Sequence, residues 1–366
     1  MEKKRICKIR VLKNICYFLV PIVLIILVYI IIQNIKRRPV ITKDIKLDKS
    51  TSNSLKGISS ILILIAHFYT MFYSFESKEI SWFHLSKLCG NFSANAALVI
   101  FMFISGYGLS ISHTDKESFI HFCKHRLWKV YKPLLIVSIL SVIIYILLPN
   151  IYSIEQLTHY RITDIVNKSH YFSQFSTDVI LFSIGYLDWY VLCISIFYFI
   201  YWLTCRFYTS RFKRSFLLLS LMIIYYIISF LLLDKGYAHF YRYPWAFFAG
   251  HFIANYRKYT RIEKYQLGIP YILFIIVSFI NSDIILIFSW IIAIIILFIS
   301  FFLSPQYTIE GRNITFLGNI SYFIYLSHTR IAFVLIFFIG FNSLLVAILI
   351  TILISTLLYK ITNKKL

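Results

Sequence analysis

The sequence predicts an all-α protein, a polytopic transmembrane bundle of about ten core helices with one additional hydrophobic segment at its N-terminal end. Hydrophobic residues make up 59% of the chain and charged residues 14%, whereas soluble domains carry about 25% charged residues. The mean hydropathy is +0.76. The hydrophobic residues form continuous runs and do not alternate with polar ones, as they would in membrane-spanning strands. We therefore expect helices that face lipid.

The hydrophobic runs follow one another along the chain, most of them long enough to cross a hydrocarbon core of about 30 Å. They lie near 15–33, 55–73, 93–112, 133–149, 179–204, 215–233, 239–255, 267–281, 284–303, 317–339 and 343–359. No repeat of about 20–50 residues and no Gly/Ser linker separates them. We expect a basic N-terminal segment with an extra hydrophobic helix and a cytoplasmic linker at 1–54, and one transmembrane domain at 55–360.

The net charge of +22 is spread over short clusters between the hydrophobic runs. Basic loops at 113–132, 205–214 and 256–266 alternate with near-neutral or acidic loops at 74–91 and 150–178. This alternation is typical of cytoplasmic and outer loops, so the residue-55 end and the C-terminus are predicted to be cytoplasmic. Because no basic face with interleaved aromatics remains, nucleic acid is excluded as a partner. The Ile-, Lys- and Tyr-rich composition indicates a multi-pass protein of a bacterial inner (plasma) membrane.

Two parts of the chain fit this topology less well. The run at 15–33 has basic residues on both sides, so a spanning helix and a re-entrant or interfacial segment bent at Pro21 both remain open. The loop at 304–316 is the weakest cytoplasmic loop, because Glu310 cancels Arg312.

His67 is the clearest ionisable residue inside a predicted span. Lys56 stands at the cytoplasmic end of the same helix, and eleven residues place His67 roughly 16 Å deeper, near mid-bilayer. An imidazole at this depth can accept a proton from a hydroxyl near neutral pH, as a general base must. The alternative is a histidine that only forms hydrogen bonds with Ser or Tyr on a neighbouring helix.

A second polar stripe lies in the 317–339 span. Ser321, Tyr325 and His328 share one helix face at i, i+4 and i+7, and His328 is also near mid-membrane. The stripe indicates either a cavity or a hydrogen-bonded seam between helices.

Three further groups of residues are candidates for binding. Ser105, Gly106 and Tyr107 form a small-residue stretch, against which a ligand or a neighbouring backbone can pack closely. Asp188, beside Trp189 toward the outer side of its helix, can orient a histidine, bind an acceptor hydroxyl or simply lie at the interface.

The basic segment 124–133, with Arg126 and Lys129, suits the phosphates of a cofactor, although charge alone favours an ordinary positive-inside loop. The six cysteines form no CxxC pair and no metal-ligand spacing, and we predict no metal. No Walker loop, GxGxxG, GxSxG or HExxH motif is present, which argues against ATP-driven transport and the soluble hydrolases.

Taken in order, these segments resemble the acyltransferase 3 family of membrane-bound O-acyltransferases, over about residues 50–360. The matching motifs are Lys56-Gly57-Ile58 with His67, the aromatic Ser-Gly-Tyr helix at 101–107, Arg126 and Lys129 before Pro133, the Trp-led helix at 189–192, and the Leu-Gly-x-x-Ser-Tyr-x-x-Tyr-Leu-x-His stretch at 317–328. The chain departs from the family by Lys56 and Lys129 in place of arginines and by one extra residue before Pro133. Lysine keeps the charge but loses the bidentate fork of arginine.

The resemblance implies transfer of an acyl group, usually acetyl, from cytoplasmic acyl-CoA to a hydroxyl of a surface polysaccharide or its lipid-linked precursor. The implied cofactor-binding residues are Lys56, Arg126 and Lys129 at the CoA phosphates and Ser105, Gly106 and Tyr107 along the acyl channel. His67 is the implied base or nucleophile, His328 the second catalytic histidine, and the implied substrate-binding residues are Asp188, Trp189, Ser321 and Tyr325.

Other functions are compatible with a polar path through a bundle. A transporter or flippase of a lipid-linked sugar is the first alternative, although no charged pairs or inverted repeat support it. A polysaccharide polymerase is the second, and it would carry a larger outer loop with paired basic residues. Within the family, a succinyl donor remains open beside acetyl.

Overall fold

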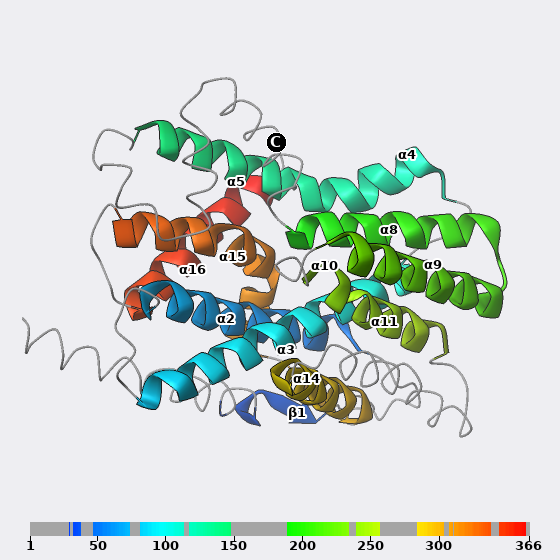
Figure 1. Ribbon diagram of the computed structural model, residues 1–366, viewed down its shortest axis with the longest axis horizontal. Coiled ribbons are helices and arrows are strands. Elements are labelled where there is room, and N and C mark those ends of the chain that lie inside the picture. The colour runs from blue at the N-terminus through cyan, green and yellow to red at the C-terminus, as the bar shows by residue number, and fades with distance from the viewer. Residues whose placement is uncertain are drawn as a thin grey trace, which may run out of the picture. The chain divides into compact units, whose positions relative to one another are not determined.

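The computed structural model describes residues 29, 32–37, 47–73, 81–112, 117–147, 189–233, 239–256, 284–303, 307–309, 311–337 and 344–363. Helices make up about 91% of it, which confirms the all-α prediction (Figure 1). The longer helices are α2 (Lys49–Tyr73), α3 (Ser81–Ser112), α5 (Trp128–Leu147), α8 (Trp189–Phe207), α9 (Arg211–Leu232), α11 (Pro244–Tyr256), α14 (Ile284–Leu303), α15 (Arg312–Phe337) and α16 (Leu344–Asn363). The shorter elements are β1 (Ile35–Arg37), α4 (Phe119–Phe122), the π-helix η1 (Cys123–Leu127), α10 (His239–Arg242) and β2 (Tyr307–Ile309).

The longer described helices lie where spans were predicted, although their ends differ, and the predicted number of about ten spans is not confirmed. Within the described residues, four helical segments are long and apolar enough to cross a membrane: Ser93–Ser112, Trp189–Phe207, Arg211–Leu232 and Leu345–Asn363. Helix α3 begins well before the predicted span at 93, because its first turns mix polar and apolar residues that a hydropathy run misses. The predicted run at 239–255 is divided at Tyr243, since Pro244 lacks an N–H and suits the first turn of a new helix. The run at 267–281 and most of 15–33 lie outside the described residues.

The chain forms two compact units. The first comprises 1–104, 256–332 and 342–361, and the second comprises 105–255, 333–341 and 362–366. Helix α3 belongs partly to each unit. Helix α16 lies almost wholly in the first unit, and α15 lies largely in it. The two candidate motifs with histidines, His67 and His328, fall in the first unit.

In the first unit, a group of polar residues lies where α2 and α15 begin. Strand β1 pairs antiparallel with β2, with Lys36 opposite Thr308. The Asp48 carboxylate accepts hydrogen bonds from the Thr51 N–H at 2.6 Å and from the Thr308 hydroxyl at 3.0 Å, and so caps α2 while holding β2. The segments before α2 and α15 therefore lie on the same side of their helices, as the alternation of loop charges predicts.

Helices α2 and α15 run parallel and cross at two glycines. A Cβ on Gly57 would meet the Ile314 carbonyl oxygen at 2.5 Å, and one on Gly318 would meet the Asn53 carbonyl oxygen at 1.9 Å. The Asn53 amide donates to the Asn319 side chain at 2.9 Å beside this crossing. Only glycine allows backbones to approach so closely, and the crossing therefore fixes the register of the two helices.

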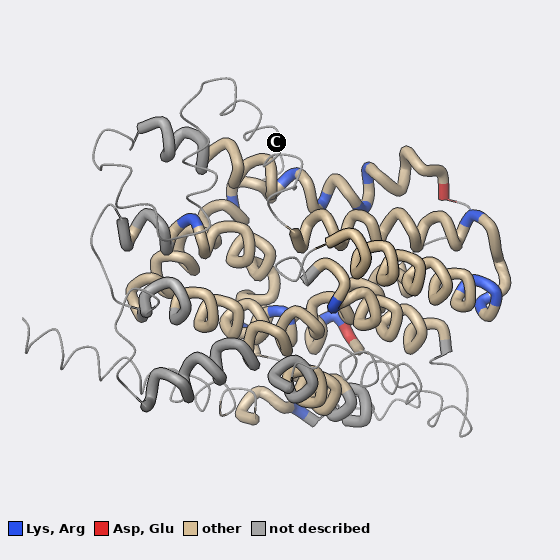
Figure 2. The backbone as a smooth tube through the Cα atoms, in the orientation of Figure 1, with Lys and Arg blue, Asp and Glu red and all other residues tan. Residues whose placement is uncertain are grey.

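In the second unit, α8 and α9 lie side by side and are joined by a short turn (Figure 1). The buried Arg214 holds this turn, because its guanidinium donates to the carbonyl oxygens of Tyr208 and Thr209, both at 3.3 Å. Figure 2 shows Lys and Arg gathered at the start of α9, where Arg211 and Lys213 also lie. Helix α3 packs against α11 at Gly106, where a Cβ would lie 2.0 Å from the Phe247 carbonyl oxygen.

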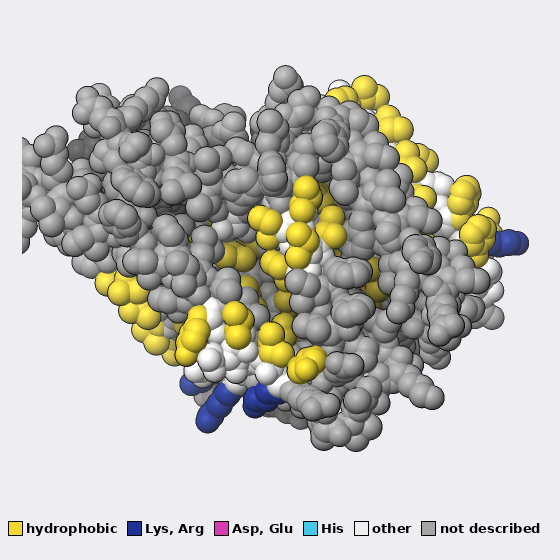
Figure 3. Space-filling view, turned by 90° about the horizontal axis from the view of Figure 1, so that it is seen from below, with side chains coloured by type: hydrophobic (Ala, Val, Ile, Leu, Met, Phe, Trp, Pro, Cys, Tyr) yellow, Lys and Arg dark blue, Asp and Glu magenta, His cyan; other side chains and the backbone are white. Residues whose placement is uncertain are grey.

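The surfaces of several helices suit lipid. Exposed hydrophobic side chains run along α9, from Ile223 to Leu232, and along α16, from Leu345 to Ile361. On the face drawn in Figure 3, the described side chains are mostly hydrophobic, and Lys and Arg stand at its edges. Such continuous apolar surface is expected of a membrane protein, which this chain is.

Candidate functional site

The parallel course of α2 and α15 brings the two predicted mid-membrane histidines together. The rings of His67 and His328 meet edge to face, with centroids 4.8 Å apart and planes at 76°. His67 is exposed although the residues around it, from Ile63 to Phe68, are buried. His328 is only 3% exposed. The His67 imidazole is thus exposed, and the buried His328 imidazole packs against it.

The backbone of α15 holds the buried ring of the pair. The Nδ1 atom of His328 lies 2.6 Å from the Tyr325 carbonyl oxygen and 3.2 Å from that of Ile324. The Tyr325 ring is 5.9 Å from the His328 ring, and Phe68 of α2 lies at 6.4 Å. These contacts leave His328 little freedom to rotate.

The other predicted residues of the first unit have different surroundings. Ser321 is buried, and its hydroxyl donates to the Gly318 carbonyl oxygen one turn earlier at 2.8 Å, so it belongs to the glycine crossing. Lys56 is half-buried and precedes Gly57 at the same crossing. The structure therefore brings Tyr325 to the histidine pair, and it places Lys56 about three turns and Ser321 about two turns of helix away.

In the second unit, the Ser-Gly-Tyr stretch of α3 is packed on both sides. Gly106 contacts the Phe247 backbone of α11, Tyr107 is buried, and the Ser105 hydroxyl forms a hydrogen bond with Tyr198 of α8. Close packing with a neighbouring helix, one of the two roles predicted for the glycine, is what the structure shows. A role in an acyl channel remains a prediction.

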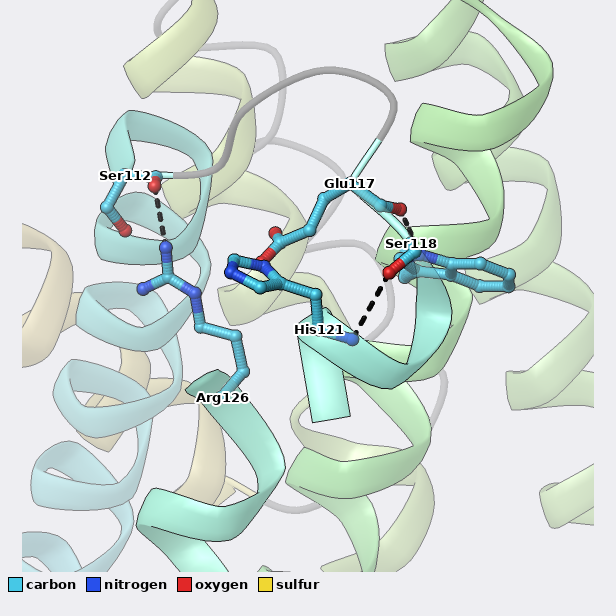
Figure 4. Close-up of polar contacts among 6 residues, drawn as sticks. Ser112, Glu117, Ser118, His121 and Arg126 are labelled. Carbon is cyan, nitrogen blue, oxygen red and sulfur yellow. Dashed lines mark hydrogen bonds and ion pairs between the residues drawn. The ribbon is translucent and has the colours of Figure 1, made fainter. Parts of the chain in front are cut away.

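The predicted basic segment contains a π-helix. Residues Cys123–Leu127 form η1 between α4 and α5, and Arg126 lies within it. The Arg126 guanidinium donates to the Ser112 carbonyl oxygen at 2.6 Å, at the end of α3, as Figure 4 shows. Lys124 and Lys129 are exposed. Single π turns within helices are frequent at functional sites, because they change the direction of the side chains that follow.

An acidic and a histidine side chain stand next to Arg126. The Glu117 carboxylate accepts a hydrogen bond from His121, whose ring packs 4.0 Å from that of His125 (Figure 4). The indole of Trp202 donates to the Glu117 carbonyl oxygen at 3.1 Å. Burial raises the pKa of the neighbouring Cys123 thiol, and a backbone hydrogen bond only partly offsets this. The thiol is therefore a poor candidate for a nucleophile.

Trp189 begins α8 and is stacked on Tyr243, with ring centroids 5.7 Å apart, and Phe240 lies edge-on at 6.4 Å. The contacts of this aromatic cluster are with other side chains of the second unit. The predicted residue Asp188 lies outside the described residues.

Sequence reasoning missed two polar residues inside the helices. His251 of α11 is fully buried, and its Nδ1 lies 2.8 Å from the Ser110 hydroxyl while its Nε2 lies 2.9 Å from the Asn255 amide and 3.1 Å from the Ser215 hydroxyl. Arg330 of α15 is half-buried and donates to the Leu326 carbonyl oxygen. Both lie within predicted spans, so the depth criterion that selected His67 would have found them.

A family model described as an acyltransferase domain, that of acyltransferase 3, matches residues 51–360. The chain belongs to the acyltransferase 3 family. No curated protein and no solved structure matches it. As a member of the acyltransferase 3 family the chain is an acyltransferase, and the matched range contains both histidines and both glycines of the α2–α15 crossing.

Proposed function

We propose that this acyltransferase moves an acyl group, acetyl in the first instance, from cytoplasmic acyl-CoA to a hydroxyl of a cell-surface polysaccharide or its lipid-linked precursor. The protein would act in the inner membrane of a bacterium, with the residue-55 end and the C-terminus in the cytoplasm. The observation that supports this best is the pair formed by exposed His67 and buried His328, on helices that enter from the same side.

In this proposal His67 is the general base. It takes the proton from the acceptor hydroxyl while that oxygen attacks the thioester carbonyl carbon. The C–S bond then breaks, and the proton passes from His67 to the departing CoA thiolate. A variant of this path has His67 itself attack the thioester and carry the acyl group before the hydroxyl takes it.

Lys56, Arg126 and Lys129 would contact the phosphates or pantetheine of acyl-CoA, because charge-assisted hydrogen bonds to phosphate suit basic side chains at the cytoplasmic face. Ser105, Gly106 and Tyr107 would line the path of the acyl chain. Asp188, Trp189, Ser321 and Tyr325 would face the acceptor or support the histidines. Each of these roles is testable by single substitution.

The test uses purified protein in lipid nanodiscs. Release of free thiol is followed from acetyl-CoA and from succinyl-CoA, with and without a glycan extract of the native strain, beside a His67→Ala variant of matched thermal stability. Glycan-dependent thiol release that the variant loses supports acyl transfer through His67. No release from either donor by folded protein would overturn the proposal in favour of a transporter or flippase of a lipid-linked sugar, which moves substrate without consuming CoA.

A further inference from the structure

The contacts of His328 determine which of its nitrogens carries hydrogen. Both neighbours of Nδ1 are backbone carbonyl oxygens, those of Tyr325 at 2.6 Å and Ile324 at 3.2 Å. A carbonyl oxygen only accepts hydrogen bonds, so Nδ1 must be the N–H donor. Among the described residues the only carboxylates are Asp48 and Glu117, and neither forms a contact with this ring. A buried, unpaired imidazolium would be costly, and the ring is therefore neutral.

The other nitrogen, Nε2, consequently carries a lone pair, and this lone pair has no hydrogen-bond partner. The Nε2 atom of His328 is buried and has no such partner within the part of the chain that the structure describes. Leaving a buried acceptor unsatisfied is costly, and a role in the chemistry is one explanation for such a group. The ring against His328 at 4.8 Å is that of His67, the exposed member of the pair.

We infer that His328 is a positioning residue: a turn of the exposed His67 ring, whose centroid lies 4.8 Å from that of His328, brings its N–H to the unpaired Nε2. This inference rests on the proposed function and deepens it. A neutral imidazole has one N–H and one lone pair, so the His328 acceptor decides which His67 nitrogen is protonated. The remaining His67 nitrogen then presents its lone pair to the acceptor hydroxyl. The arrangement follows the general logic of a base oriented by a third group, here with a neutral partner in place of a carboxylate.

The proton balance follows directly. The proton of the acceptor hydroxyl moves to the lone-pair nitrogen of His67, whose other N–H continues to donate to His328 Nε2. The imidazolium so formed keeps a hydrogen bond on the side of His328 and returns the new proton to the CoA sulfur when the C–S bond breaks. His328 stays neutral with its hydrogen on Nδ1 throughout.

The first experiment reads the tautomer without acyl-CoA. Protein labelled with ¹⁵N-histidine is reconstituted in lipid, and solid-state NMR distinguishes protonated from unprotonated ring nitrogens, with the His328 signals assigned by their loss in His328→Gln. We expect hydrogen on Nδ1 of His328 and none on Nε2. Hydrogen on Nε2 would overturn the inference, whether or not the protein transfers acyl groups.

The second experiment separates positioning from packing. Glutamine and methionine have similar shapes, but only glutamine offers an oxygen near the place of Nε2. We expect His328→Met to lower kcat roughly a hundredfold with little change in KM, and His328→Gln to recover a large part of it. Because His328 acts through His67, adding His328→Met to His67→Ala should cost nothing further. Equal activity of the Met and Gln variants, at equal thermal stability, would overturn the inference. Wild-type protein without any transfer would refute the proposed function, and the tautomer would then be judged by NMR alone.

Discussion

Each of the two units contains a histidine buried among helices, but the two differ in their hydrogen bonds. In the second unit His251 has a partner at both ring nitrogens, through Ser110 of α3, Ser215 of α9 and Asn255 of its own helix. In the first unit His328 has carbonyl partners at Nδ1 alone, and it faces an exposed second histidine. His251 thus links helices through its hydrogen bonds, whereas His328 keeps an acceptor nitrogen without a partner.

The comparison separates two kinds of histidine, both within predicted spans, that the sequence cannot distinguish by depth. A satisfied histidine lowers the free energy of the fold, because the hydrogen bonds of His251 with Ser110 and Ser215 join helices. A histidine with an unpaired nitrogen stores a cost that only a ligand or a reacting group repays. We therefore expect hydrogen-bond satisfaction to separate these two histidines better than depth does.

The most direct test of this difference is to remove His67 and His251 in turn. We expect His67→Ala to lower acyl transfer roughly 10²–10⁴-fold, because general-base catalysis contributes about that factor. The folded fraction of His251→Ala should retain most of its kcat. The measurement is thiol release from acetyl-CoA per folded molecule in nanodiscs. Comparable losses of kcat in the two variants would show that hydrogen-bond satisfaction does not separate them.

The second unit can still contribute to the binding of acyl-CoA, and Arg126 is the residue that tests this. Charge-assisted hydrogen bonds contribute about 1.5–3 kcal/mol, so Arg126→Ala should raise the KM for acyl-CoA roughly tenfold or more with a smaller change in kcat. Lys213→Ala, an exposed basic residue of α9, is the matched control. If both variants raise KM equally, the effect is that of overall positive charge and η1 is no specific contact.

The geometry of the first unit depends on the glycine crossing. A methyl group on Gly318 would overlap the Asn53 carbonyl oxygen, and overpacking of this kind costs about 1–3 kcal/mol. Gly318→Ala should therefore lower both thermal stability and kcat, because α2 must move and carries His67 with it. Gly108→Ala is the control, since a Cβ there meets nothing within 4 Å and the change favours the helix. Unchanged kcat in Gly318→Ala would show that the close approach does not align the histidines.

The smallest expected effect is the loss of stability in the second unit. His251→Leu leaves Ser110, Ser215 and Asn255 without their shared partner, and we expect a loss of about 1–3 kcal/mol, since hydrogen bonds between membrane helices are individually modest. Thermal unfolding in detergent measures it, and His251→Gln should lose less. A variant as stable as the wild type would mean that the network does not join the helices energetically.

Only part of the arrangement of the two histidines could be predicted from the sequence. Depth along each helix follows from counting residues, so the common level of His67 and His328 was predictable. Which of the two is exposed was not, because that depends on how two segments far apart in the chain pack. The same holds for the pairing of β1 with β2 and for the His251 network, whose members come from three helices.

Other features carried a signal that hydropathy alone does not use. The extension of α3 to Ser81 and the π turn around Arg126 involve polar residues outside the apolar runs. Hydropathy reports which residues suit lipid, and a helix continues beyond the membrane wherever its backbone hydrogen bonds can. The Pro244 break was visible in the sequence as a helix start.

The glycine crossing has a consequence for relatives of this chain. Ten residues separate Gly57 from His67, and ten separate Gly318 from His328. One residue inserted in either interval would rotate its histidine by about 100° and move it about 1.5 Å along the helix. An insertion in one helix would abolish the pair, and matched insertions in both would abolish it too, because both histidines would turn in the same sense and away from the shared interface. The spacing of ten positions from glycine to histidine in both helices is thus a length rule by which family members that keep this pair can be recognised from sequence.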